Sequence, residues 1–245
     1  MEPATISSAA SSATHSGVAP AVSGSALTAR FGAFTGEYRY VVDQRSAIAA
    51  IDWMLGSAEV SPLTENIVVG VDIETSSLKP ADGRIRLCQL AAGSRAVVID
   101  AFAFDPWPLI RSALIDLRPD WIAHNAEFEQ SWFARHAGFT LTPMFDTRWV
   151  YIRERARRFG PEVGGSSSLQ AVCAELLDFE LSKEQRLSDW TAPVLSAAQV
   201  EYAALDALVL PVLRARLERD AIESGWTAEI AAATQRSHEE ADRFR

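Results

Sequence analysis

The sequence predicts an α/β fold in which a mixed β-sheet is flanked by α-helices. Three observations support this class. Short runs of β-branched and other apolar residues, typical of buried strands, are concentrated between residues 38 and 100. A turn signal at residues 92–94 joins two of these runs as a hairpin, which gives antiparallel pairing. From residue 107 onward, segments with a helical spacing of apolar residues predominate. Strands arranged as a hairpin and then mixed with helices predict one mixed sheet covered by helices.

The first half of the chain contains most of the predicted strands. Each is short, apolar and rich in β-branched residues, and together they cover residues 38–42, 67–72, 84–91 and 96–100. The last two are separated by Ala92-Gly93-Ser94, a sequence typical of a tight turn. Between the first two strands, residues 44–55 are expected to form a helix with Ile48, Ile51 and Leu55 on one face.

The second half is predicted to be mainly helical. Helices are expected over residues 107–117, 126–136, 146–157, 168–177 and 197–218. The short apolar segment 121–123 is expected to be a buried strand. The serines at 166–168 are candidates to cap the helix that follows them, and Pro211 predicts a kink in the last helix.

The domain organisation follows from composition. Residues 1–35 are rich in Ala, Ser, Thr and Gly without a sustained period, so we expect a disordered tail there. A transit peptide is the alternative, because the tail is rich in serine and poor in acids. A single domain is expected over residues 36–222 and a helical extension over residues 223–245.

Charge and cysteine content limit the possible classes of function. The formal net charge of -9 opposes non-specific coating of nucleic acid, but a metal site and a local basic patch can still bind it. Cys88 and Cys173 lack the spacing of a zinc site, and two cysteines make no disulfide framework, so a cytoplasmic location is expected. No apolar run approaches the roughly 20 residues that span a bilayer, so no membrane partner is expected.

The strongest candidate for chemistry is a pair of acids, Asp72 and Glu74, at the end of the strand over residues 67–72. Alternate residues of a strand point to one face, so the two carboxylates can converge. Two carboxylates at so short a distance repel each other unless a cation lies between them. A divalent cation is the natural candidate. The alternative is a strand end that runs into a polar turn.

Two later segments carry further polar groups on apolar elements. After the strand at 121–123 come His124 and Asn125, and then a helix whose first turn contains Glu129. Asn125 as N-cap and acids favoured by the helix dipole explain this segment without chemistry. Tyr202 and Asp206 are four residues apart on an otherwise apolar helix face. A buried aspartate there needs a partner, which is the tyrosine, a neighbouring element or a metal.

Together these segments, VDIETSSL, HNAEFE and YAALD, resemble the three exonuclease motifs of the DEDD superfamily of 3′-to-5′ exonucleases. With Tyr202, the third segment resembles the tyrosine subclass of this superfamily. The histidine subclass would need His where this chain has Glu201. The stretches MFDTRWV, which contains Asp146, and LSKEQRLSDW are similar to the ribonuclease D and Werner-type branch. The resemblance covers about residues 38–218.

The resemblance implies a fold, an activity and a set of site residues. The fold is ribonuclease H-like, and the activity is hydrolysis of nucleic acid from the 3′ end with release of nucleoside 5′-monophosphates. It also implies two divalent metal ions, Mg²⁺ or Mn²⁺, and the metal-ligating residues are Asp72, Glu74, Glu129 and Asp206. Tyr202 is expected to orient the attacking water. The expected substrate-binding residues are His124, Asn125, Phe128 and Lys183.

The expected partner is single-stranded nucleic acid or a 3′ end, with RNA and DNA both open and no protein partner predicted. Too few residues follow Glu218 for the helical domains that ribonuclease D carries, and we expect no polymerase domain. Phe128 and Trp190 either stack on a base or belong to the core. The arginines between 153 and 158 form either a phosphate-binding patch or a solvated helix end.

One departure from the family pattern concerns Glu129, which stands where the family usually has Asp. An acid that meets its metal through a water tolerates one more methylene, so an active enzyme is expected. The alternative is a catalytically impaired module that binds nucleic acid without cutting it.

Overall fold

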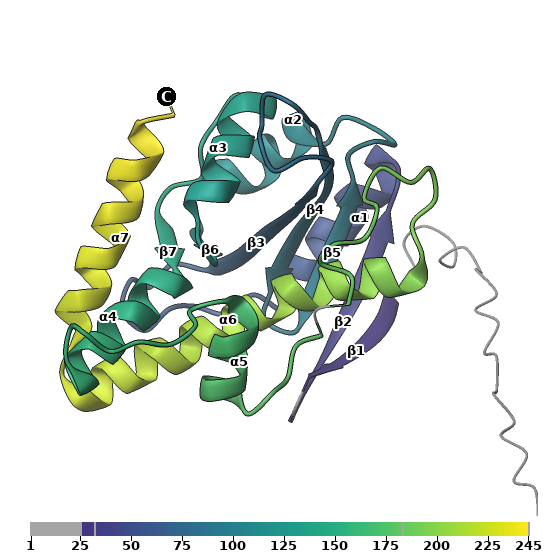
Figure 1. Cartoon of the computed structure of the whole chain (residues 1–245). Helices are drawn as coiled ribbons and strands as arrows, with labels where there is room; N and C mark the ends of the chain where they lie inside the picture. Colours follow the sequence, from purple (N-terminus) through teal and green to yellow (C-terminus); the bar gives the residue numbers. More distant parts are fainter. Residues whose placement is uncertain (1–25, 32, 183, 245) are drawn as a thin grey trace, which may run out of the picture.

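A computed structural model describes residues 26–31, 33–182 and 184–244 of the chain. The described residues form a mixed sheet with the strand order β1-β2-β5-β4-β3-β6-β7 (Figure 1). The strands are β1 (Ala26–Phe31), β2 (Phe34–Val41), β3 (Val68–Thr75), β4 (Ile85–Ala92), β5 (Arg95–Asp100), β6 (Asp120–Ala123) and β7 (Met144–Asp146). The pairs β2–β5, β3–β6 and β6–β7 are parallel, and β1–β2, β3–β4 and β4–β5 are antiparallel. The predicted mixed sheet is therefore confirmed.

Helices cover both faces of this sheet (Figure 1). The helices are α1 (Gln44–Leu55), α2 (Trp107–Ile110), α3 (Glu127–His136), α4 (Thr147–Phe159), α5 (Leu169–Leu177), α6 (Ala197–Ser224) and α7 (Thr227–Asp242). Side chains of α4, α5, α6 and α7 form one core cluster with one face of the sheet, while α1, α2 and α3 form a second cluster with the opposite face. Helix α2 continues into a π-helical turn, Arg111–Ile115, so the helix predicted over 107–117 is present but irregular.

Helix α6 lies close to the sheet because small residues face it. Gly70 of β3, Ala91 of β4 and Ala96 of β5 are in register across the three central strands. A Cβ added at Gly70 would lie 3.1 Å from Cβ of Leu210 and 3.2 Å from the carbonyl oxygen of Ala207, both on α6. This short distance brings the polar residues of α6 to the strand that carries Asp72.

The structure corrects the predicted tail. Residues 26–31, expected to be disordered, form the edge strand β1, which pairs antiparallel with β2 and ends where Phe31 faces Phe34. Leu27 packs against the core and Ala29 is buried, so contacts with α6 and β2 stabilise a segment whose own sequence is a weak strand signal. The rest of the predicted tail, residues 1–25, lies outside the described residues.

Three local predictions are also corrected. The buried face of α1 consists of Ala47, Ala50, Ile51 and Met54, whereas Ile48 is 44% exposed, because small residues face the sheet. The three-residue strand β7 was not predicted, since so short a segment shows no period. Asp146 ends this strand and caps α4, instead of beginning the helix. Within the described residues, no helix combines the length and apolar character that a membrane span requires.

Candidate active site

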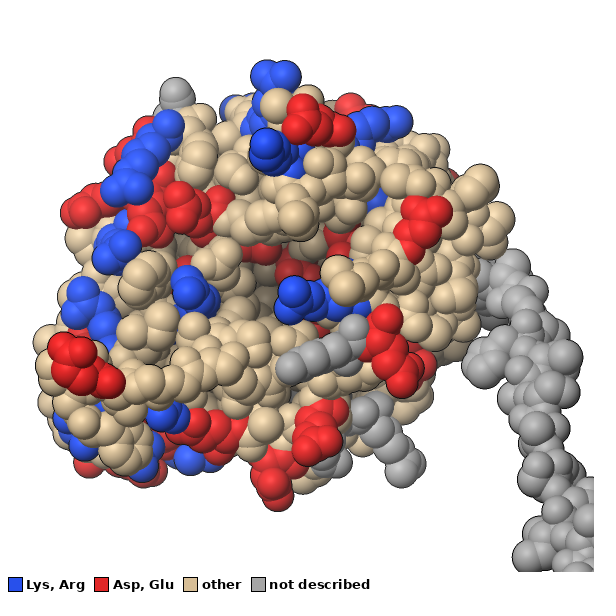
Figure 2. Space-filling model, viewed as in Figure 1, with Lys and Arg blue, Asp and Glu red and all other residues tan. Residues whose placement is uncertain are grey.

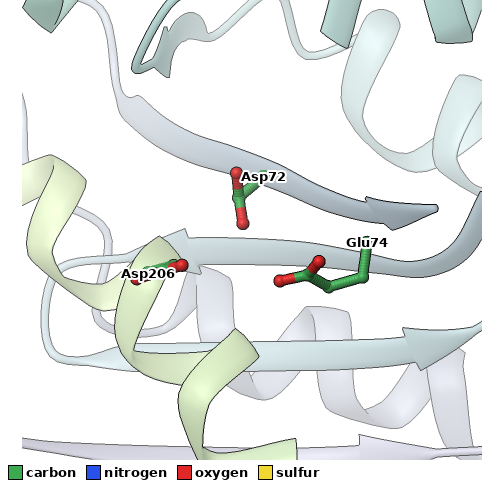
Figure 3. A group of neighbouring side chains, drawn as sticks. All are labelled: Asp72, Glu74 and Asp206. Carbon is green, nitrogen blue, oxygen red and sulfur yellow. The ribbon is translucent and has the colours of Figure 1, made fainter. Parts of the chain in front are cut away.

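Three carboxylates from two elements converge at the face of the sheet that α6 covers (Figure 3). Asp72 and Glu74 alternate along β3 and project to the same side, as predicted. Asp206 reaches them from α6, more than a hundred residues further along the chain. One oxygen from each of the three carboxylates lies within 4.8 Å of the other two. Asp72 and Glu74 are partly exposed, while Asp206 is buried.

The electrostatics of this cluster show a need for positive charge. Burial raises the pKa of Asp72 to about 7. Burial, together with repulsion from the neighbouring carboxylates, raises the pKa of Glu74 and of Asp206 well above the ordinary values. Oδ1 of Asp206 is buried and has no hydrogen-bond partner among the residues that the structure describes. Hard oxygen ligands, mutual repulsion and an unpaired buried oxygen fit a divalent cation of the Mg²⁺ type.

Glu129 faces the same cluster from the first turn of α3. It is 3% exposed, and its Oε2 has no hydrogen-bond partner in the described ranges of the chain. Burial raises its pKa well above the ordinary value, and the charge of Asp72 adds to this rise. Glu129 in turn raises the pKa of Glu74, although it lies outside the group of three within 4.8 Å. A solvated acid at a helix start does not account for a buried, unpaired carboxylate, so a ligand role is favoured.

Tyr202 lies one helical turn before Asp206 and is buried. Its hydroxyl forms a side-chain hydrogen bond with Asp206, and its ring packs at 6.4 Å from that of Trp190. Burial, followed by the charge of Asp206, raises the pKa of Tyr202 above its ordinary value. The hydroxyl therefore keeps its proton at neutral pH, where it can donate a hydrogen bond but cannot act as a base.

An open cleft of about 480 Å³ leads to these residues. Figure 2 shows a hollow near the centre of this face, with acidic atoms in its floor and basic residues at its rim. Besides Asp72, Glu74, Tyr202 and Asp206, its walls include His124, Asn125, Arg148, Ser167 and Arg186. The cleft thus combines a negatively charged floor, suited to cations, with a rim that carries positive charge.

His124 and Asn125 line this cleft but are held by the protein itself. Nδ1 of His124 is 2.9 Å from Oγ1 of Thr147, and its Nε2 is 2.8 Å from the carbonyl oxygen of Ser167. Burial lowers the pKa of His124 to about 4, so the ring is neutral and Nε2 carries the proton for the carbonyl. Oδ1 of Asn125 accepts from Nη1 of Arg148 at 3.0 Å. Both residues shape the wall, and their predicted contacts with substrate stay predictions.

The predicted N-cap of α3 is wrong, because the cap position is Ala126 and the side-chain oxygen of Asn125 accepts from Arg148 instead of from the helix. Asn125 has a left-handed φ of 73° and donates its backbone N–H to Asp146, as does Ala126. The same carboxylate caps α4 through the N–H groups of Arg148 and Trp149. Asp146 is fully buried, so one aspartate joins the starts of α3 and α4 and thereby supports the position of Glu129.

Two arginines of the cleft were not predicted as functional. Nε of Arg148 donates to Oγ of Ser167 at 3.1 Å and Nη1 donates to Asn125, so both acceptors are neutral. Arg186 is exposed at the same cleft. Among the described residues neither arginine forms an ion pair, so the charge of each remains available to an anion. The only signal in the sequence was that Arg148 lies in MFDTRWV, two residues after Asp146.

The arginines further along α4 mostly have partners in the protein. Arg155 pairs with Glu175 at 2.5 Å, and Arg158 pairs with Glu154 at 3.3 Å. The guanidinium of Arg157 lies 5.6 Å from the ring centre of Trp226. These contacts favour a structural helix end over a phosphate-binding patch.

The remaining predicted contacts are less central. Phe128 packs against the core on the α3 side of the sheet, with its ring 6.0 Å from that of Trp132. Trp190 is 6% exposed and belongs to the core under α6. For both aromatic residues, core packing is the favoured interpretation. Lys183 lies outside the described residues.

Comparison with known proteins identifies relatives of the chain. A family model described as 3′-5′ exonuclease matches residues 43–222. Ribonuclease D of Acidiphilium cryptum (strain JF-5) is 32% identical over 170 residues, which cover 67% of this chain and 41% of that protein. The chain therefore spans less than half the length of this curated relative.

Solved structures give the same result at the level of the fold. Brucella melitensis NrnC with bound Mg²⁺ is 30% identical, with a TM-score of 0.61 over 77% of this chain and 87% of that one. The same protein bound to pGG gives 28% identity and a TM-score of 0.60 over 77% and 86% of the two chains. Escherichia coli RNase D is 20% identical and gives a TM-score of 0.66, and the match covers 84% of this chain and 50% of that one. These similarities confirm the ribonuclease H-like fold that the motifs implied.

Proposed function

The chain belongs to the 3′-5′ exonuclease family, and on this premise we propose that it hydrolyses nucleic acid from the 3′ end and releases nucleoside 5′-monophosphates. The observation that carries the proposal is the group of three carboxylates within 4.8 Å at the floor of an open cleft. No arrangement of that kind is needed for folding, because clustered buried acids cost stability unless a cation neutralises them.

We propose that Asp72, Glu74, Asp206 and Glu129 hold two divalent cations, Mg²⁺ or Mn²⁺. Such cations would supply the positive charge that stabilises the attacking and leaving oxygens of a phosphodiester. Asp72 would be the residue best suited to contact both cations, because its charge raises the pKa of each of the other three acids. A carboxylate that starts in the first turn of α3 is held rigidly, since Asp146 fixes that turn.

Tyr202 is proposed to orient the water that attacks the phosphorus. Its hydroxyl is protonated and donates that proton to the Asp206 carboxylate, so its oxygen can accept a hydrogen bond from the water without taking up a proton. The packing of its ring against Trp190 fixes the position of the hydroxyl. Orientation rather than proton abstraction is therefore its role.

The proposed substrate is single-stranded nucleic acid or a 3′ end, RNA or DNA. The cleft is open to solvent, and among the described residues Arg148 presents a guanidinium whose charge is not neutralised by a carboxylate. We propose that Arg148 and Arg186 contact backbone phosphates, and that His124, Asn125, Phe128 and Lys183 lie along the path of the substrate. The related NrnC bound to pGG supports a nucleotide ligand in this cleft.

The proposal extends to the organisation of the chain. The catalytic domain is placed at residues 36–222 with β1 added, and the extension at 223–245 contains α7, which packs against β7 and α4. We place the enzyme in the cytoplasm, where the buried thiols of Cys88 and Cys173 stay reduced. The alternative of a module that binds without cutting has no support from the relatives, which bear the names of nucleases.

The decisive experiment uses 5′-labelled single strands of DNA and of RNA with Mg²⁺, Mn²⁺ or EDTA. We expect a ladder that shortens from the 3′ end, requires the metal and identifies the better substrate. Asp72→Ala and Asp206→Ala should each abolish the ladder and leave the circular dichroism spectrum unchanged. Glu223 is an exposed acid at the far end of α6, so the control variant Glu223→Ala should still produce the ladder. Retained binding with no cleavage of either polymer in the presence of metal contradicts the proposal.

A further inference from the structure

Gln89 is a polar residue in the middle of the sheet whose side chain has no hydrogen-bond partner among the described residues. It is completely buried, and within the part of the chain that the structure describes neither its Nε2 nor its Oε1 forms a hydrogen bond. Its neighbours on the same face of β4 are Leu87 and Ala91, and across the sheet it faces Val98 of β5. Buried amides are nearly always hydrogen-bonded, since an unmade hydrogen bond is costly, so this exception needs an explanation.

The position of Gln89 provides one. In the antiparallel pairing of β3 with β4, Gln89 lies directly opposite Asp72. Directly opposite residues project to the same face, with Cβ atoms about 4.5–5.5 Å apart. That face is the one covered by α6, because Gly70, two residues before Asp72, contacts Leu210 of α6. The side chain of Gln89 therefore projects to the same face of the sheet as the Asp72 carboxylate, the face from which α6 supplies Asp206.

A second buried glutamine shows what a purely structural role looks like in this protein. Gln130 of α3 is 1% exposed, yet its Nε2 donates to the carbonyl of Leu141 and its Oε1 accepts the N–H of the same residue. The fold thus satisfies a buried amide completely where that amide holds two segments together. Gln89 holds no segment, and an apolar side chain of its length would fill the same space.

We infer that Gln89 is a positioning residue whose Nε2 donates a hydrogen bond to the Asp72 carboxylate when a divalent cation occupies the acidic cluster. The inference rests on the proposed function of the same site. An ionised carboxylate offers about four lone-pair directions, so Asp72 can bind cations and still accept one N–H. That hydrogen bond is charge-assisted, and it fixes the rotation of the carboxylate. Partners of this kind affect metal affinity and activity by about 10–100-fold.

The test compares Gln89→Met, which keeps the length of the side chain and removes the amide, with Gln130→Leu as a structural control. The affinity for Mn²⁺ is measured by titration calorimetry without substrate. The melting temperature is measured in EDTA, and kcat and KM are measured with a labelled oligonucleotide. For Gln89→Met we expect Mn²⁺ affinity about 10-fold weaker, kcat lower with KM unchanged, and a melting temperature equal to or above the parent's. Gln130→Leu should lower the melting temperature.

The outcomes separate this inference from the proposed function. If Gln89→Met binds Mn²⁺ within about twofold of the parent, or if its melting temperature falls as that of Gln130→Leu does, the positioning role is refuted. A parent protein that binds no Mn²⁺ and cleaves no substrate refutes the proposed function itself.

Discussion

Asp72 should make the metal-free protein less stable as the pH rises. Burial raises the pKa of this carboxyl group from its ordinary value of 3.8 to about 7 in the folded state. When the pKa of an acid is higher in the folded state, the folded state binds more protons than the unfolded state does. Its contribution to stability is therefore fully present below the unfolded pKa and is lost as the pH rises through the folded pKa.

The size of the effect follows from these two pKa values. Between about pH 5 and about pH 8, proton linkage predicts a loss of about 2.5 kcal/mol in the free energy of unfolding from this one group. The carboxyl group is partly open to the cleft, so solvent screening makes this an upper value. Asp72→Asn mimics the protonated acid, and its stability relative to the parent should therefore rise over the same interval by about the same amount.

The assay is urea denaturation of parent and Asp72→Asn in EDTA, at both pH values, followed by circular dichroism. Asp120→Asn is the control of opposite sign, because hydrogen bonds from Thr64, Arg214 and Asn66 lower the pKa of Asp120, which also pairs with the buried Arg214 at 2.6 Å. That variant should lose about 3–5 kcal/mol. If Asp72→Asn is no more stable relative to the parent at the higher pH than at the lower, the carboxylate is not desolvated as described, and the argument for a cation site weakens with it.

Two further predictions concern the fourth acid and the rim of the cleft. Glu129→Asp should keep or raise kcat, because the shorter acid restores the residue usual in the family and a water spans the difference; an inactive variant with a native melting temperature would mean that the site is built around the longer acid. Arg148→Gln should raise KM about tenfold and reduce the slope of log KM against log salt concentration by about one, since one charge-assisted phosphate contact is lost. Arg158→Gln on the same helix is the matched control, because Arg158 pairs with Glu154, and a similar effect in both variants would refute a specific contact at Arg148.

Part of the site could be predicted because its information is local. Alternation along a strand places Asp72 and Glu74 on one face whatever the rest of the chain does, and four-residue spacing places Tyr202 and Asp206 on one face of a helix. The structure brings the three acids Asp72, Glu74 and Asp206 together, as expected. The serine cap of α5 and the bounds of α1 were predictable for the same reason.

Other features depend on neighbours that the sequence does not identify. Asn125 looks like a helix cap, but its side-chain oxygen accepts from Arg148, and Asp146 of β7 binds the backbone N–H groups of Asn125 and Ala126. Arg148 looks like any basic residue of α4 until its partners prove to be the neutral Ser167 and Asn125, while Arg155 and Arg158 are bound by acids. Strand β1 exists because β2 and α6 cover it, and its own composition suggested disorder.

The sequence by itself determined the family, the types of residue at the site and the side of each element on which they lie, because these follow from spacing along one strand or one helix. Only the tertiary structure decided that β3 and α6 meet, since this depends on the row of small residues formed by Gly70, Ala91 and Ala96. It also decided which charges remain unpaired and how strongly burial shifts the pKa of each acid. Burial and pairing are properties of the packed molecule, and long-range contacts set both.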